Sequence, residues 1–333
     1  MKNKRKIAVV TGGAGFIGSH MVDLLLAKQF KVNVIDNLVG GHKKNYKHHI
    51  KNPLFKFTKM NICELKPNNI LFKNADYIFH FAGIGDIVPS IENPANYMET
   101  NVQGTIKVLE AARFSKVKKF VYAASASCYG LTKTKVKENF NINIEHPYAL
   151  SKYMGELAAF HWNKVYKVPV NSIRIFNAYG TRSRTTGTYG AVFGVFIKQK
   201  LKNKPLTIVG DGKQSRDFVY VTDVAKAFFA AAKTSHTGRI YNVASGIPQT
   251  INYLARLIGG KKVFIPNRPG EPKKSWADTS KIRRELKWKP QINFDKGVAM
   301  MMQEIQQWQN APLWTPKSIK LATKNWFKFL SKK

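Results

Sequence analysis

A glycine-rich turn close to the N-terminus constrains the fold more than any other feature of this chain. Gly12, Gly15 and Gly18 have the spacing GxxGxxG. They follow the apolar run Lys6–Val10 and open the helical stretch Phe16–Lys28. Small residues here let the backbone approach a pyrophosphate, whose negative charge faces the N-terminus of the helix. This order of strand, turn and helix predicts a dinucleotide-binding unit, and the alternative is a tight turn that binds no ligand.

An acidic residue at the end of the second predicted strand indicates which dinucleotide is bound. Asp36 follows Lys31–Ile35 and lies 18 residues after Gly18, where a carboxylate accepts hydrogen bonds from the adenosine ribose. A carboxylate there repels a 2′-phosphate, so NAD is favoured over NADP. Lys43 and Lys44 lie nearby and weaken that preference slightly.

The first half of the chain alternates apolar runs with helical stretches, which is typical of a doubly wound parallel sheet of the Rossmann type. The predicted strands are Lys6–Val10, Lys31–Ile35, Phe55–Lys59, Tyr77–Phe81, Phe120–Ala124 and Val170–Phe176. The predicted helices between them are Phe16–Lys28, Pro94–Phe114 and Tyr148–Tyr166. The second half is less regular, with loops rich in Gly and Pro and a further helical stretch at Leu286–Trp308.

A tyrosine and a lysine four residues apart indicate acid–base chemistry. Tyr148 and Lys152 lie one turn apart on the same face of a predicted helix. A neighbouring ammonium favours the phenolate, so a phenol that ionises near pH ~10 becomes a base closer to neutrality. Tyr129 and Lys133 share the spacing, but Gly130 places them in a predicted loop. The structural alternative is a tyrosine that packs its ring at a helix start.

Charge and cysteine content restrict the remaining classes of protein. The formal net charge is +36 at pH 7, which is compatible with binding to nucleic acid or to an anionic membrane. The lysines are scattered and no nucleic-acid-binding motif accompanies them, so we favour a generally basic surface and no specific nucleic acid. The 2 cysteines, Cys63 and Cys128, form no disulfide framework, which favours the cytoplasm. No apolar run reaches the roughly 18 residues that span a bilayer.

Taken together, the motifs resemble those of the NAD-dependent nucleotide-sugar epimerase/dehydratase group of extended short-chain dehydrogenases/reductases, closest to the UDP-glucose (UDP-N-acetylglucosamine) 4-epimerases. The matching stretches of the first half are Thr11–Gly18, Val34–Asn37, Phe79–Gly83, Asn101–Thr105, Phe120–Ser125, Tyr148–Lys152 and Arg174–Asn177. Those of the second half are Gly210–Gly212, Arg216–Phe218, Arg268–Glu271 and Trp276–Asp278. They follow the family order from residue 1 to about residue 308.

The resemblance implies a role for each matching residue. Tyr148 is the catalytic base, Lys152 holds the nicotinamide ribose and lowers the Tyr148 pKa, and Ser125 binds the reacting sugar hydroxyl. The cofactor NAD is expected to contact Gly12, Gly15, Phe16, Ile17, Gly18, Asp36, Asn37, Asn61, Ile62, Phe81, Ala82, Gly83, Asn101 and Lys152. The nucleotide sugar is expected to contact Ser125, Asn177, Arg216, Arg268, Glu271 and Ser275. Asn61 departs from the acid usual in the family, and we expect no bound metal.

Two small residues bear on the reaction that the resemblance implies. Ala126 and Ser127 stand where related 4,6-dehydratases have Asp-Glu, and glucuronate decarboxylases have a Glu at the second place. Without these proton carriers the hypothesis is a 4-epimerase acting on UDP-glucose and UDP-galactose or on their N-acetyl forms. A dehydratase, decarboxylase or dehydrogenase of the same family is the alternative, and a nucleic-acid-binding protein on a Rossmann scaffold is a more distant one. The small Ser275 leaves room for an N-acetyl group.

The expected organisation is a Rossmann domain with a smaller C-terminal α/β substrate domain. The expected ranges are 1–176 for NAD binding, with 218–245 returning to it, 177–217 and 246–310 for the nucleotide sugar, and 311–333 for a basic tail. The tail residues predicted to share one apolar helical face are Ile319, Ala322, Trp326 and Leu330. We expect this helix to dock on its own domain or a partner subunit more readily than on a membrane. The resemblance also implies a homodimer.

Overall fold

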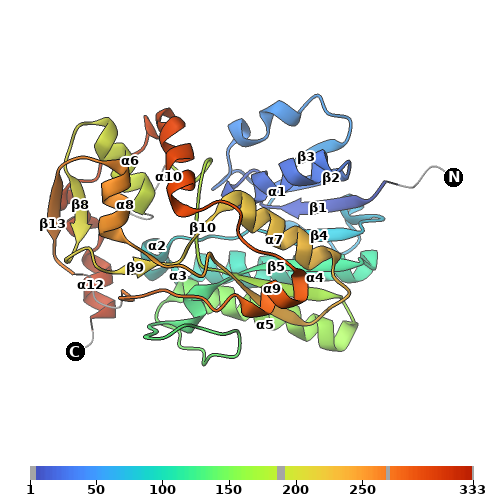
Figure 1. The fold of residues 1–333 in the computed structure, drawn as a ribbon. Helices are drawn as coiled ribbons and strands as arrows, with labels where there is room; N and C mark the ends of the chain where they lie inside the picture. The colour runs from blue at the N-terminus through green and yellow to red at the C-terminus, as the bar shows by residue number, and fades with distance from the viewer. Residues whose placement is uncertain (1–4, 186–191, 268–270, 332–333) are drawn as a thin grey trace.

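The fold is built on a parallel sheet of seven strands, seen in a computed structural model that describes residues 5–185, 192–267 and 271–331 (Figure 1). All neighbouring strands are parallel. From one edge to the other they are β11 (Arg239–Val243), β6 (Val170–Ile175), β5 (Lys119–Ser125), β4 (Tyr77–His80), β1 (Ile7–Thr11), β2 (Lys31–Asp36) and β3 (Phe55–Lys59). The strand order reverses between β1 and β4, and ligands bind at the carboxyl ends of strands beside such a reversal.

Helices cover both faces of the sheet because successive strand side chains point to opposite faces. Ala8 and Val10 of β1 join the core formed with α1 (Phe16–Ala27) and α7 (Val221–Lys233). Val9 between them belongs to the opposite core. The helices on that face are α4 (Gly104–Ser115) and α5 (Pro147–Tyr166). The prediction of a doubly wound Rossmann sheet is confirmed.

One predicted helix is interrupted in the structure, and another occupies part of its predicted range. The stretch Pro94–Phe114 divides into α3 (Pro94–Met98), a π-helical turn at Glu99–Gln103, and α4. The stretch Leu286–Trp308 was predicted to contain a helical stretch, and it does so in its second half. There α9 (Ser280–Leu286) ends and α10 (Phe294–Gln303) begins only after Pro290, with the Asn293 side chain accepting the N–H of Lys296 at 2.9 Å. A proline and a capping asparagine are the local reason for the break.

A second group of elements packs around a separate hydrophobic core at the other end of the molecule (Figure 1). Its helices and longer strands are α6 (Val192–Leu201), β8 (Leu206–Val209), α8 (Ile251–Ile258), β13 (Lys262–Ile265) and α10. Short strand pairs join it to the sheet: β7 (Asn177–Tyr179) with β10 (Phe218–Tyr220), and β9 (Ser215–Arg216) with β12 (Gln249–Thr250). The fully buried Trp308 is the largest side chain of this core.

The C-terminal tail forms two short helices instead of the single predicted helix. Helix α11 (Pro316–Ala322) begins with a capping box between Thr315 and Ser318, and α12 (Lys324–Leu330) follows it after Thr323. The Thr323 hydroxyl donates to the Ile319 carbonyl at 2.8 Å and is buried at this junction. Ile319 and Trp326 are buried, so the predicted apolar face packs against the chain itself.

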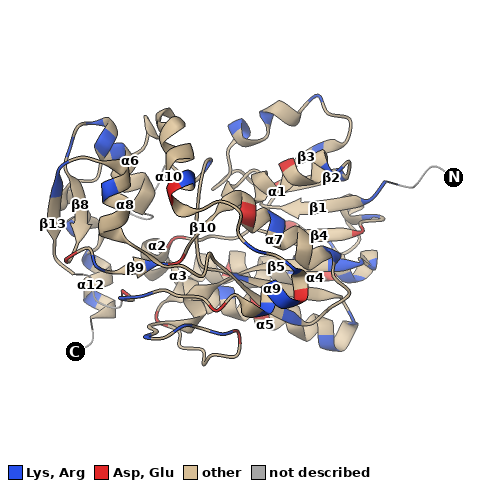
Figure 2. Cartoon of the chain, in the orientation of Figure 1, with Lys and Arg blue, Asp and Glu red and all other residues tan. Residues whose placement is uncertain are grey.

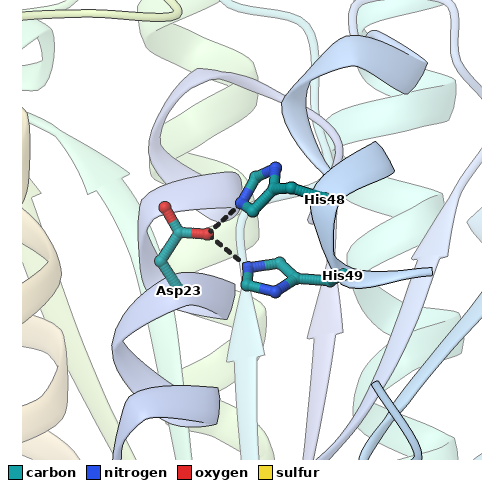
Figure 3. A group of neighbouring side chains, drawn as sticks. All are labelled: Asp23, His48 and His49. Carbon is teal, nitrogen blue, oxygen red and sulfur yellow. Dashed lines mark hydrogen bonds and ion pairs between the residues drawn. The ribbon is translucent and has the colours of Figure 1, made fainter. Parts of the chain in front are cut away.

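A carboxylate on α1 ties this helix to the connection between β2 and β3 (Figure 3). Both imidazoles of His48 and His49 approach the same Asp23 oxygen, Oδ1, with their Nε2 atoms at 3.2 and 2.7 Å. The other oxygen, Oδ2, forms an ion pair with Arg182 Nη1 at 2.8 Å. Although burial acts in the opposite direction, hydrogen bonds from these histidines and the Arg182 charge lower the pKa of Asp23. Because Arg182 already neutralises the carboxylate, we interpret the group as a structural contact. It joins α1, the connection between β2 and β3, and the segment that contains Arg182.

Basic residues are spread over helices and loops in both parts of the molecule (Figure 2). Several of the few acids are buried and accept hydrogen bonds, such as Asp217 from Gly246 N at 2.9 Å and Asp223 from Gln291 N at 2.7 Å. No helix within the described ranges has the length and apolar character to cross a bilayer.

Candidate active site

One cavity of about 980 Å³ opens at the carboxyl ends of the strands, between the sheet and the second core. Nearly all residues singled out from the sequence line it. They are Gly12, Gly15, Phe16, Ile17, Gly18, Asp36, Asn37, Asn61, Ile62, Phe81, Ala82, Gly83, Ser125, Tyr148, Lys152, Asn177, Arg216, Glu271 and Ser275. Arg268 lies outside the described residues. The topology therefore brings together side chains that are separated by up to about 260 residues in the sequence.

The glycine turn is closed so tightly that side chains would not fit at two of its positions. Gly12 has φ of +70°, and a Cβ there would lie 2.6 Å from the backbone nitrogen of Ala82. A Cβ at Gly18 would collide with the Gly12 carbonyl oxygen. Glycine is required at both positions, and the resulting cradle at the start of α1 fits a pyrophosphate.

Asp36 lies at the end of β2 with its carboxylate held in place. Its Oδ2 accepts the Ala14 N–H at 3.0 Å and its Oδ1 accepts the Leu38 N–H at 2.8 Å. Burial raises the pKa of Asp36, although these two hydrogen bonds act in the opposite direction. A carboxylate oxygen accepts more than one hydrogen bond, so Asp36 retains capacity for ribose hydroxyls. The glycine cradle and this fixed acid fit NAD.

Asn61 and Ile62 lie at the predicted adenine end of the cavity. The Asn61 side chain accepts the Cys63 N–H at 3.1 Å and caps the short 3₁₀ turn Ile62–Glu64. Ile62 is buried in the sheet core. The amide at position 61 therefore has a local structural task as well as a place on the cavity wall.

Asn101 differs from its prediction as a cofactor-binding residue, because it is fully buried and does not line the cavity. Its side chain accepts the Ile84 N–H at 2.8 Å and donates to the Ile84 carbonyl at 3.0 Å and to Ser151 Oγ at 2.9 Å. It lies in the π-helical turn and packs so closely that a Cβ on Gly83 would clash with it. Asn101 fixes the loop after β4 that forms the cavity wall.

The residues expected to do the chemistry lie on β5 and α5. Ser125 ends β5, and Tyr148 and Lys152 belong to the first turns of α5. Pro147 occupies the first turn of α5, and the His146 ring accepts the Ala149 N–H at 3.2 Å. The Ser125 side chain lowers the pKa of Tyr148, and its Oγ donates to Ser127 Oγ at 3.0 Å. Tyr129 and Lys133, which share the spacing of Tyr148 and Lys152, do not form an equivalent pair. Tyr129 is buried in a small cluster of its own and donates its hydroxyl to Asn242 at 2.8 Å.

Burial dominates the electrostatics of this group. Burial raises the pKa of Tyr148, and the opposing effect of the Ser125 side chain is smaller than the effect of burial. Burial also lowers the pKa of Lys152 to about 8, despite the opposing charge of Glu156. The Tyr148 pKa is therefore not shifted towards neutrality as expected, because the cost of burying a phenolate is larger than the opposing effect of Ser125. The lowering effect of Lys152 itself stays a prediction. The Lys152 ammonium lies 4.6 Å from the centre of the Tyr122 ring.

A buried ion pair supports α5 from behind the site. Glu156 Oε2 lies 2.6 Å from Arg174 Nη2, and its Oε1 accepts the Ser172 hydroxyl at 2.6 Å. Both side chains are almost completely buried, and the carboxylate raises the pKa of Arg174 despite desolvation. The pair joins α5 to β6, which neighbours β5 in the sheet. It therefore fixes the helix that carries Tyr148 relative to the strand that carries Ser125.

The far side of the cavity contains paired polar side chains. Arg216 Nη2 forms an ion pair with Glu271 Oε1 at 2.7 Å, and Arg216 Nη1 donates to the Pro272 carbonyl at 2.7 Å. The Ser275 hydroxyl donates to Asn177 Oδ1 at 3.2 Å. Ser275 is therefore part of the wall and not a residue that only faces solvent.

Among the further residues that line or support the cavity are some that the sequence interpretation did not select as site residues: Asp86, Tyr97, His146, Arg184 and Trp326. The Tyr97 ring packs edge-on against Tyr148 with centroids 6.4 Å apart, and its hydroxyl donates to the Asp86 carbonyl at 2.6 Å. Arg184 Nη1 binds Asp86 Oδ2 at 2.5 Å. The position of His146 before Pro147 is a helix-start signal, but no local pattern indicated the others.

Comparison with known proteins identifies the family of the chain and several relatives named for UDP-sugar chemistry. Residues 8–244 match the NAD dependent epimerase/dehydratase family. A putative UDP-glucose 4-epimerase of Methanocaldococcus jannaschii is 37% identical over 87% of this chain and 95% of that relative. UDP-glucuronic acid decarboxylase 4 of Arabidopsis thaliana is 32% identical over 91% of this chain and 70% of that relative. The structure of UDP-glucuronic acid 4-epimerase from Bacillus cereus with UDP-glucuronic acid and NAD has a TM-score of 0.85 at 30% identity, covering 90% and 99% of the two chains.

Proposed function

This chain belongs to the NAD-dependent epimerase/dehydratase family, and from that premise we propose that it is a nucleotide-sugar 4-epimerase. The observation that carries the proposal is the arrangement of Ser125, Tyr148 and Lys152 on one cavity wall, next to a glycine cradle. Relatives in this family include both epimerases and decarboxylases, so the reaction has to be argued from the residues of the site.

The residues after β5 favour epimerisation over elimination or decarboxylation. Ala126 and Ser127 line the cavity directly beside Ser125 and carry no carboxyl group. Ser125 and Ser127 instead bind each other, with Oγ atoms 3.0 Å apart. Removal of water needs an acid and a base at the carbons that react, and these two positions supply neither.

The proposed mechanism uses two side chains directly. Tyr148 takes the proton of the C4 hydroxyl, and Ser125, which lines the same cavity, orients that hydroxyl. Lys152 follows Tyr148 by one turn of α5 and is charged below its pKa of about 8. NAD, when bound, supplies the acceptor and then the donor of the C4 hydride. The ion pair of Glu156 and Arg174 holds α5, which carries Tyr148, against β6.

The charges near Tyr148 favour a neutral sugar over a uronic acid. Burial has the largest effect on the Tyr148 pKa and raises it, whereas Ser125 lowers it. The negative charge of Asp86 raises it further. Arg184 already pairs with Asp86, so the carboxylate of a uronic acid would compete with Asp86 for that cation. We therefore propose UDP-glucose and UDP-galactose, or their N-acetyl forms, as substrates.

The small Ser275 supports acceptance of the N-acetyl forms, because its hydroxyl donates to Asn177 and leaves space on the wall. Replacing it with a bulky residue, Ser275→Tyr, should remove activity on UDP-N-acetylglucosamine before activity on UDP-glucose. The conservative Ser275→Ala variant is the matched control, because it keeps the space and removes only the hydroxyl. Equal losses on the two sugars in Ser275→Tyr would reject the role of this residue.

The test of the proposal is incubation of the NAD-loaded enzyme with a panel of UDP-, dTDP-, GDP- and CDP-linked sugars, including UDP-glucuronic acid, with products identified by NMR. We expect a C4 epimer from a neutral UDP-hexose or UDP-N-acetylhexosamine. A 4-keto-6-deoxy sugar or a pentose as the product would show that the chain is a dehydratase or a decarboxylase instead.

We also propose that the enzyme is a homodimer that pairs through α5. Leu150, Met154 and Leu157 lie on one helical face and are 38, 39 and 50% exposed. An apolar stripe of this kind on an outer helix is typical of a protein interface. Light scattering should give twice the chain mass, and Leu150→Lys with Leu157→Lys should give the monomer. A monomeric wild-type protein would contradict this.

A further inference from the structure

The C-terminal tail contacts both the second core and the short helix α2 (Ile87–Glu92). At its start the Trp314 carbonyl accepts the Gln199 side-chain N–H of α6 at 2.8 Å. Ile319 of α11 is then buried in the same core as α6 and α8. Finally, Asn325 of α12 donates to Glu92 of α2 at 3.2 Å. The tail is therefore attached to α6 at its start and to α2 near its end.

Trp326 brings the tail into the cavity itself. It is 7% exposed and lines the same cavity as Tyr148, Lys152 and Ser275. The helix that carries it, α12, packs against α2, and Val88 and Ile87 of α2 also line the cavity.

The position of α2 shows which part of a ligand Trp326 faces. Asp86 immediately precedes α2, and its carbonyl accepts the Tyr97 hydroxyl at 2.6 Å. Tyr97 in turn packs edge-on against the Tyr148 ring. The start of α2 therefore adjoins the proposed base, whereas the adenosine end of the cavity lies at β2, near Asp36 and Asn61. Trp326 belongs to the sugar end.

We propose that Trp326 forms a wall of the sugar-binding part of the site and contacts the pyranose of the nucleotide sugar. The inference rests on the proposed function, because it assumes that a nucleotide sugar is the ligand. An indole presents a broad apolar face with one N–H donor, which matches the mixture of C–H and hydroxyl groups on a sugar. The tail supplies this residue from outside residues 8–244, the part of the chain that matches the family.

Binding of a UDP-sugar and of UDP alone separates this role from a merely structural one. The measurement is calorimetry on full-length, NAD-loaded protein in a Tyr148→Phe background, so that the sugar is not turned over. Trp326→Ala should weaken binding of the UDP-sugar about 10-fold while leaving the affinity for UDP unchanged. Trp326→Phe should restore part of the affinity for the sugar. Phe329→Ala is the matched control, since Phe329 lies on the same helix and is 59% exposed.

Two outcomes would overturn the inference. Equal weakening for UDP and for the UDP-sugar in Trp326→Ala would mean that the tail only stabilises the fold. In that case the loss of binding in Trp326→Ala and Trp326→Phe would follow the fall in their melting temperatures. Unchanged binding of both ligands would mean that Trp326 does not reach the sugar. If the protein without tail substitutions binds no nucleotide sugar, the proposed function fails, and that result is distinct from either outcome.

Discussion

The two sides of the cavity are built in different ways. On the sheet side, Ser125 and Tyr148 belong to a seven-residue strand and a 20-residue helix, held together by the buried Glu156–Arg174 pair. On the other side, Arg216 and Ser275 lie on a two-residue strand and a loop. The latter positions depend on side-chain pairs and on Asp217, which accepts the Ala277 N–H at 3.0 Å.

This difference suggests a division of labour between the two sides. A rigid strand and helix hold reacting groups within the small tolerances that proton transfer needs. Short strands, loops and an added tail change shape and residue more easily, which suits the part that selects the sugar. Substitutions on the sheet side should therefore abolish turnover or stability, and substitutions on the other side should change which ligand is bound.

The largest effect is expected from removing the proposed base on the sheet side. Tyr148→Phe should lower turnover by about 10²–10⁴-fold, because it removes the group that takes the proton and keeps the ring. Binding of the nucleotide sugar should change little, as calorimetry would show. Tyr129→Phe is the control, since Tyr129 shares the spacing and lines the same cavity but donates its hydroxyl to Asn242 at 2.8 Å. A fully active Tyr148→Phe enzyme would remove the distinction between the two sides.

The second effect concerns the support of α5. Glu156→Gln should lower the free energy of unfolding by about 3–5 kcal/mol, because the Arg174 charge stays buried without its partner. Chemical denaturation measures this loss. Asp211→Asn is the control: Asp211 pairs with Lys213 at 4.0 Å on the exposed surface, so its loss should cost no more than about 1 kcal/mol. Similar costs for both variants would show that the pair does not support the helix.

A pH effect is expected from His146, whose pKa burial lowers from 6.5 to about 4. The unfolded chain takes up this proton as the pH falls through 6.5, whereas the folded chain does so only near 4. Stability from this group is therefore present above pH 6.5 and lost between 6.5 and 4, by up to about 3 kcal/mol. His146→Asn keeps a capping side chain and should flatten this part of the stability curve. An unaltered slope in His146→Asn would contradict the account.

The smallest effect on stability is expected at Asp23, which does not line the cavity and which contacts His48, His49 and Arg182 (Figure 3). Asp23→Asn should cost about 1 kcal/mol, because the carboxylate is 32% exposed and its partners can turn to water. Equimolar zinc should not raise the melting temperature, because Arg182 opposes a second cation beside Asp23. A zinc-dependent rise that disappears in Asp23→Asn would show a metal site instead.

The strands were predictable because buried parallel strands are continuous apolar runs, and β1 to β6 begin and end within a residue or two of their predicted bounds. The breaks were harder to predict. The π-helical turn at Glu99–Gln103 depends on the buried bonds of Asn101 to a distant loop, which no local pattern reveals. The tail face was predicted from its spacing, but its division at Thr323 depends on packing against two separate parts of the chain.

The site was predictable where it lies in motifs and not where it depends on burial. Gly12, Asp36 and Tyr148 follow from spacing, and the structure places them on one cavity. The direction of the Tyr148 pKa shift could not be predicted, since it depends on how completely the fold excludes water from the phenol. Asp86 and Trp326 come from segments without a chemical signature, and only the topology brings them to the cavity.

The most direct test of the central claim follows a deuterium atom at C4 of the substrate. The NAD-loaded enzyme is given a UDP-hexose labelled at C4, with no added oxidant, and the epimer is analysed by NMR and mass spectrometry. If Tyr148 serves a simple oxidation and re-reduction at C4, the label is retained at C4 of the product. Loss of deuterium to solvent, or a product lighter by water or carbon dioxide, would contradict the account.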